Sequence, residues 1–243
     1  MANDETSETS PAVFHATANI SQWSDYSTDK FMAPEMSKFT SASITDMSQV
    51  DPEQNHWQAN YILNTVLGST VPSPRRQQLF NFLRRCHSAF SEYAHAREST
   101  LIFLSERHRV LKYMDAIGHW EAYLAYSWQG YRLLVPQPVK LFQTGDNSVL
   151  ERLHALYCRA KHADEHLFSG DLLEDSPLCV WLTNEGLRST ETSLSFDEMS
   201  GILEDLSRWA SAVQDPKTMN EKARSIFSST SDESRSRYDK SPP

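Results

Sequence analysis

Hydrophobic residues recur at intervals of three and four along the middle of the chain, which is the period of an amphipathic helix. The pattern predicts four helices, at residues 52–67, 74–104, 110–134 and 149–167. Ser73 is the expected N-cap of the second helix, with Pro74 at its first position. Asp146 or Asn147 is the expected cap of the fourth. Four helices with short connections predict a mainly α fold built on a four-helix bundle.

The last third of the chain has a different pattern. Residues 180–183 and 192–195 are short apolar or β-branched runs, separated by a turn at Gly186, and predict a small β-hairpin. Ser195 and Glu198 have the spacing of a capping box, so an additional C-terminal helix is expected to follow. This helix should pack back on the bundle.

The two ends of the chain are rich in serine and threonine and show no sustained period. Residues 1–54 and 218–243 are therefore expected to be an acidic disordered leader and a disordered tail. Isolated aromatic residues in the leader, such as Phe39, could still dock on the folded part. Between the ends we expect one domain, with the bundle at residues 55–168 and the hairpin and last helix at 169–217.

Composition narrows the class of protein. Hydrophobic residues make up 39% of the 243 positions, and no run approaches the roughly 18 apolar residues of a membrane helix. The acidic N-terminus is unlike a signal peptide, and the three cysteines form no C-x-x-C pair. A cytoplasmic protein without a membrane segment is the expectation. Only seven glycines are present, and no Gly-rich loop, which argues against a nucleotide-binding α/β fold.

The charge is unevenly distributed. Residues 1–73 hold 2 basic and 9 acidic side chains, residues 74–167 hold 13 and 9, and residues 168–243 hold 8 and 14. The resulting charges are −7, +4 and −6. A basic centre between acidic flanks is typical of a phosphate-binding helical core, and a solvated helix surface gives the same count. The candidate RNA-binding residues are Arg75, Arg76, Arg84, Arg85 and Lys161.

The densest group of chemically useful side chains lies at the end of the fourth predicted helix. In a continuous helix Arg159, His162 and His166 share one face. A guanidinium binds phosphate bidentately and an imidazole transfers protons near neutral pH. The three residues are thus catalytic candidates for cleavage of RNA by its own 2′-OH, with no metal or other cofactor. The helix dipole alone would also favour basic residues here.

Arg159 and His166, separated by six residues, resemble the R-x4-6-H motif of HEPN domains, over residues 56–168. HEPN domains occur in toxins, phage-defence proteins and RNA-processing factors. The resemblance implies that Arg159 binds the scissile phosphate, that His166 acts as acid or base, and that two motifs meet in a homodimer. An antitoxin or other protein partner is a further implication. The segments RAKHADEHL, PLCVWLTNEGL and WASAVQDP also resemble a group of uncharacterised bacterial proteins.

Two other interpretations stay open. One is a non-catalytic helical interaction module, in which the acidic flanks mask the basic core or recruit a partner. The other is a di-iron carboxylate bundle, which needs Glu-x-x-His pairs on helices. The residues considered for the di-iron centre are Glu92, His95, Glu121, Glu151 and His154. A zinc ion bound by His162 and His166 is a separate alternative. The first predicted helix offers no glutamate between His56 and Gly68 to complete the di-iron centre. The aromatic residues of the third helix are expected to be core.

Overall fold

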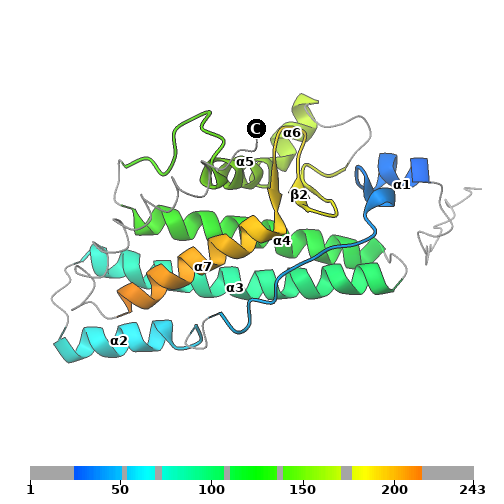
Figure 1. Cartoon of the computed structure of the whole chain (residues 1–243). Helices are drawn as coiled ribbons and strands as arrows, with labels where there is room; N and C mark the ends of the chain where they lie inside the picture. Colours follow the sequence, from blue (N-terminus) through cyan, green and yellow to red (C-terminus); the bar gives the residue numbers. More distant parts are fainter. Residues whose placement is uncertain are drawn as a thin grey trace, which may run out of the picture.

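The computed structural model describes residues 25–50, 54–68, 73–106, 110–135, 139–170 and 177–214. The predicted disorder before residue 25 and from 218 to 243 lies outside the described residues. Within them the fold is mainly helical, with one small antiparallel sheet, as predicted (Figure 1). No helix among these residues is both long and apolar enough to cross a membrane.

Two long helices, α3 (Arg75–Ser105) and α4 (Val110–Leu134), lie side by side at the centre of the molecule (Figure 1). Their boundaries agree with the predicted ones. The expected Ser73 cap is wrong, because the N-cap position falls on Pro74, whose side chain has no acceptor. Apolar residues at helical spacing bury the facing surfaces of the two helices.

The aromatic residues of α4 form the core, as expected. Trp120, Tyr123, Trp128 and Tyr131 are buried, and Tyr126 is partly buried. The indole N–H of Trp120 donates to Thr100 Oγ1 at 3.1 Å, so its one polar group is satisfied inside the core. These side chains hold the bundle together and are unavailable for stacking on bases.

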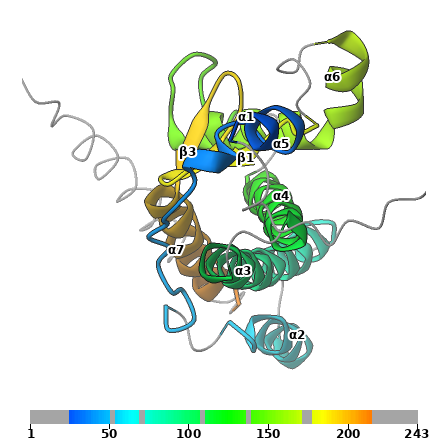
Figure 2. The same ribbon diagram turned by 90° about the vertical axis from the view of Figure 1, so that its right-hand side faces the viewer.

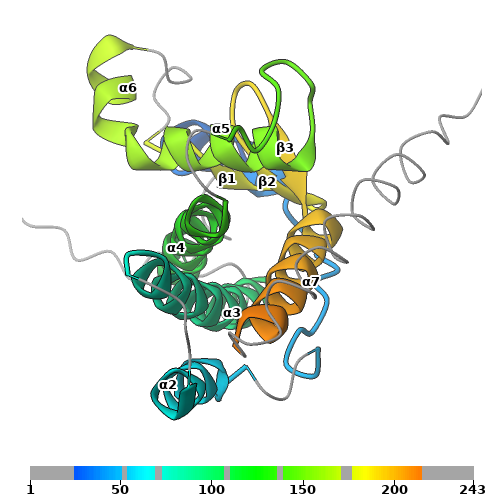
Figure 3. The ribbon, with the colours of Figure 1, turned by 90° about the vertical axis from the view of Figure 1, so that its left-hand side faces the viewer.

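Helices α2 (Trp57–Gly68) and α7 (Phe196–Val213) flank α3 (Figure 3). The predicted capping box of α7 is present: the Ser195 side chain accepts from the Glu198 N–H, and the Glu198 carboxylate accepts from the Ser195 N–H. The Tyr123 hydroxyl donates to the carbonyl of Met199 at 2.8 Å, which fixes α7 against α4.

Helix α5 (Val149–Lys161) runs across α4, whereas α3 and α4 are seen nearly along their axes in the two end views (Figures 2 and 3). The N-cap is Ser148, and the prediction of Asp146 or Asn147 is wrong. The Asp146 carboxylate accepts instead from the N–H groups of Gln143 and Ser148, which shapes the turn before the helix. The finer expectation of a HEPN-like four-helix bundle stays a prediction.

The predicted helix 149–167 is two helices. α5 ends at Lys161, and α6 (Ala163–Ser169) begins after His162, whose φ of −106° and ψ of 31° leave the helical region. Gly170 ends α6 in the left-handed conformation that glycine adopts without strain. The hydrophobic period continues through the break and so could not reveal it.

The predicted hairpin is a three-stranded antiparallel sheet in the order β1 (Trp181–Leu182), β2 (Gly186–Arg188), β3 (Ser193–Ser195). β2 was missed because its first residue, Gly186, was assigned to the turn of the hairpin. Gly186 is required at its start, since a Cβ there would lie 2.1 Å from the carbonyl oxygen of Leu194. β3 leads directly into α7, so the sheet is attached to the core (Figure 2).

The leader predicted to be disordered up to residue 54 is ordered over residues 25–50. It contains α1 (Asp25–Phe31) and a short 3-10 helix, η2 (Met36–Lys38), and then crosses the face of the bundle (Figure 1). Phe39 is 1% exposed and stacks on Phe103, with ring centroids 5.8 Å apart. Isolated apolar residues anchor this segment, and isolated residues produce no periodic signal.

Candidate functional site

Arg159 lies in the last turn of α5 with its side chain 12% exposed. One guanidinium nitrogen, Nη1, lies 3.1 Å from Nδ1 of His166, and Nη2 forms an ion pair with the carboxylate of Glu191. Glu191 belongs to the connection between β2 and β3. We call these three residues the Arg159 cluster. Three separate parts of the chain meet in it.

The break at His162 changes how the predicted catalytic residues are arranged. Arg159 and His166 are in contact, but through a bend in the chain and not along the one continuous helix that was predicted. His162 instead directs Nδ1 to the carboxylate of Glu165, at 2.9 Å. The structure therefore joins two of the three predicted catalytic residues and gives the third another partner.

The chemistry of a guanidinium sets the direction of the Arg159–His166 contact. A guanidinium is always a donor, so the nitrogen that it contacts must accept. Nδ1 of His166 is therefore the acceptor in this contact. An imidazole nitrogen with a lone pair can also accept a proton from a substrate.

The buried thiol of Cys179 interacts electrostatically with Arg159 and with the partly buried carboxyl of Glu121. Burial raises the pKa of Glu121 from 4.5 to about 7. Burial also raises the pKa of the Cys179 thiol; the charge of Glu121 raises it further, and the charge of Arg159 opposes the rise. Cys179 thus lies within electrostatic reach of both groups.

The predicted basic patch divides between structural and exposed side chains. Arg75 donates to the carbonyl of Leu134 at 3.2 Å, and the Arg85 guanidinium lies 5.2 Å from the ring centroid of Tyr126. Both therefore support the packing of α3 on α4. Lys161 is exposed and lies 6.0 Å from the ring centroid of Tyr157. The two remaining members of the patch, which are also exposed, are Arg76 and Arg84.

The two Glu-x-x-His pairs proposed for a di-iron centre have different surroundings. Glu151 accepts from the N–H groups of Gly145 and Asn147 and so orders the loop before α5. His154 packs on Trp128, with ring centroids 4.3 Å apart. Glu92 and His95 are instead joined by His119, which the sequence analysis did not consider. Glu121, the fifth residue considered, is the partly buried carboxyl whose charge acts on Cys179.

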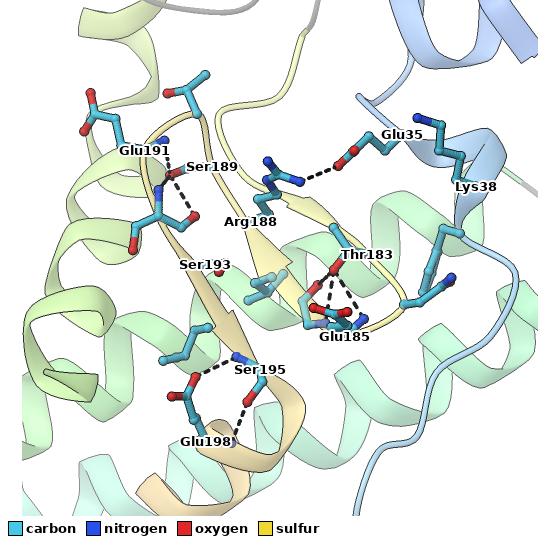
Figure 4. Close-up of a pocket in the computed structure, with 17 residues that line it drawn as sticks. Glu35, Lys38, Thr183, Glu185, Arg188, Ser189, Glu191, Ser193, Ser195 and Glu198 are labelled. Atoms are coloured by element: carbon cyan, nitrogen blue, oxygen red, sulfur yellow. Dashed lines mark hydrogen bonds and ion pairs between the residues drawn. The ribbon is translucent and has the colours of Figure 1, made fainter. Parts of the chain in front are cut away.

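A hollow of about 480 Å³ lies between the sheet and residues 35–39 (Figure 4). Its polar side chains serve the fold. Thr183 bonds the turn before β2, Ser189 bonds the turn after it, and Arg188 pairs with Glu35 at 3.1 Å. Glu191 lines the same hollow, and its N–H donates to the Ser189 hydroxyl at 3.3 Å. The Ser189 hydroxyl thus holds the backbone at Glu191, whose side chain contacts Arg159.

Sequence reasoning missed Glu191 because no local pattern links it to α5, which lies about thirty residues earlier in the chain. Comparison with protein-family models, with curated proteins and with solved structures found no match to this chain. The chemistry of the Arg159 cluster must therefore be argued from its own side chains. A guanidinium, a neutral imidazole and an exposed carboxylate can bind an anion and accept a proton.

Proposed function

We propose that this protein binds RNA by a backbone phosphate at Arg159 and cleaves it without a metal ion. The supporting observation is the 3.1 Å contact between Arg159 and a proton-accepting nitrogen of His166. Transesterification by the neighbouring 2′-OH needs a cation on the phosphate and a base beside the hydroxyl. Both groups are present in one place. The HEPN-like resemblance assigns the same two residues to this chemistry.

RNA first replaces Glu191 on the guanidinium. Glu191 is 68% exposed, so its carboxylate can move into water when a phosphate takes both guanidinium nitrogens. This exchange also frees Nδ1 of His166 from its contact with Arg159. Glu191 is thus a positioning residue, which holds Arg159 in the absence of RNA.

His166 then accepts the 2′-OH proton at Nδ1, and the 2′-oxygen attacks phosphorus. The bond from phosphorus to the 5′-oxygen breaks, and that oxygen takes a proton from water. The hydroxide left behind deprotonates the imidazolium, so the protein returns to its starting state. The products are a 2′,3′-cyclic phosphate and a 5′-hydroxyl end. Arg159 stabilises the charge that develops on the phosphate oxygens.

Arg76, Arg84 and Lys161 supply additional phosphate contacts in this proposal, because their side chains are exposed. A homodimer is part of the proposal as well. Phe168 is 91% exposed and lies two residues after His166. A second copy packed against α6 would cover this ring and bring two Arg159 clusters close together.

The test is incubation of total RNA with the purified protein in EDTA. The wild type should produce discrete fragments with cyclic phosphate ends. Arg159→Ala and His166→Ala should each lower the rate at least 100-fold, with an unchanged circular dichroism spectrum. The matched controls are Arg208→Ala, on exposed α7 surface, and His56→Ala, before α2; both should cleave as the wild type does. Equal cleavage by Arg159→Ala and the controls would reject the proposal.

The second candidate function is a non-catalytic interaction module. The observation that favours it is an exposed apolar face on α2, where Ile62, Leu63, Val66 and Leu67 are all more than half exposed. A second copy of the chain is the proposed occupant of this face or of α6. If the wild type forms a dimer by sedimentation but leaves RNA intact, this function is the better one. Phe168→Ser and Val66→Ser then distinguish the two surfaces.

A further inference from the structure

A second group of polar side chains lies on the paired helices α3 and α4, outside the Arg159 cluster. Glu92 and His95 are three residues apart on α3, so they occupy one face of that helix. His119 lies opposite them on α4. We call these three residues the Glu92 cluster. It is assembled from the middle of two continuous helices.

The three side chains converge. Glu92 Oε2 lies 2.7 Å from Nδ1 of His119, and the rings of His95 and His119 have centroids 5.1 Å apart. Each residue offers one nitrogen or oxygen atom, and the three atoms all lie within 4.8 Å of one another. Among the described residues, this is the one group of three or more histidine, cysteine or acidic side chains that meets this distance.

These distances are close to those around a bound metal ion. Bonds of about 2.0–2.2 Å to imidazole and carboxylate place neighbouring ligand atoms of a tetrahedral ion about 3.3 Å apart. The Glu92–His119 pair would open slightly from 2.7 Å, and His95 would move inward. His95 is exposed and can rotate, whereas Glu92 and His119 are partly buried and already oriented by their contact.

The direct Glu92–His119 contact explains why those two residues face each other without a metal ion. It does not explain His95, whose ring lies against the His119 ring. In the part of the chain that the structure describes, no hydrogen bond between these two rings is recorded. Two imidazoles and a carboxylate are the donor set that favours borderline ions such as Zn²⁺ and Co²⁺ over Mg²⁺ or Ca²⁺.

We propose that Glu92, His95 and His119 bind one divalent transition-metal ion of the Zn²⁺ and Co²⁺ class at the surface of the α3–α4 pair. Three protein ligands leave a coordination position for water. The side chains of Glu92 and His119 are 24% and 37% exposed, so solvent reaches the ion. The helices hold the ligand backbones, because each is more than twenty residues long and packed along its length. The metal site is independent of the proposed RNA cleavage.

The experiment is titration of the untagged full-length protein with Co²⁺, followed by visible absorption, and with Zn²⁺, followed by calorimetry. The wild type should bind one equivalent at this site, with the intense visible bands of four-coordinate Co²⁺. His95→Gln, His119→Gln and Glu92→Gln should each weaken binding of both ions at least ten-fold. These substitutions change few core contacts, and circular dichroism will verify that each variant folds.

Two controls separate this site from other histidines. Glu98→Gln changes an exposed carboxylate on α3 outside the cluster, and His166→Gln changes the Arg159 cluster. Both should bind Co²⁺ as the wild type does. The proposal is overturned if the wild type gives no four-coordinate Co²⁺ spectrum, or if the three cluster variants give the same spectrum and affinity as Glu98→Gln. Cleavage of RNA in EDTA is a separate readout, so either proposal can fail alone.

Discussion

The Arg159 cluster and the Glu92 cluster each contain histidine and glutamate, but they are built differently. The Arg159 cluster joins the end of α5, the short helix α6 and a loop of the sheet. The Glu92 cluster joins the middles of α3 and α4. A guanidinium contributes the positive charge in the first, whereas the second has no cation among its three members.

This difference predicts different ligands. The Arg159 cluster has a cation held by an exposed carboxylate, so an incoming anion needs only to replace that carboxylate. The Glu92 cluster offers one ligand atom from each of three side chains and contains no arginine or lysine, so a cation fits there. Helix ends and loops allow the first to rearrange, and two packed helices make the second rigid.

The largest effect that separates the clusters is expected from Arg159→Lys. The ammonium keeps the charge but loses the fork that binds phosphate at two oxygens. Cleavage of RNA should fall about 100-fold, while Co²⁺ binding stays as in the wild type. Initial rates in EDTA measure the first effect and visible absorption the second. A change in Co²⁺ binding would show that the two clusters are coupled.

A smaller effect is expected from Glu121→Gln. The pKa of Glu121 is raised from 4.5 to about 7 by burial, so the folded state holds a proton that the unfolded state loses at lower pH. The wild type should therefore lose stability as the pH rises from about 4.5 through 7, and the variant should not. We expect Glu121→Gln to be more stable than the wild type at pH 8, by about 2 kcal/mol relative to their difference at pH 5.

Urea unfolding of both proteins at pH 5 and pH 8 measures this difference. The result bears on the comparison, because the charges of Glu121 and Arg159 both act on Cys179. If the two proteins have the same pH dependence, the Glu121 carboxyl is solvated and burial does not raise its pKa. Trp120→Ala could not replace Glu121→Gln in this experiment. It removes a buried indole and would destabilise the core at every pH.

The smallest effect is expected from Glu191→Gln. This variant removes a partly exposed ion pair, which contributes at most about 1 kcal/mol. If RNA must displace Glu191, the variant should bind a short RNA about two- to five-fold more tightly. Fluorescence anisotropy with a labelled RNA measures this affinity. Arg159→Ala serves as the reference that lacks the phosphate contact of the cluster. Weaker binding would mean that Glu191 aligns Arg159 for the phosphate.

Part of each cluster could be predicted from the sequence. Arg159 and His166 were selected by spacing and chemistry, and the structure places them in contact. Glu92 and His95 were selected by their helical spacing. Their partners Glu191 and His119 were not found, because each comes from another element. For His119 a signal was present. In two antiparallel helices joined by a short connection, residues at about equal distances from that connection lie opposite each other.

Hydrophobic periodicity determined α3, α4 and α7, because their apolar faces repeat over many turns and their buried surfaces must match that repeat. Only the tertiary structure decided the break at His162, the additional strand β2 that begins at Gly186 and the docking of Phe39. Each depends on contacts with distant residues, and the local chain pattern does not record such contacts. The same reason applies to both candidate sites: local spacing selected two of the three residues of each cluster, and packing of separate elements supplied the third.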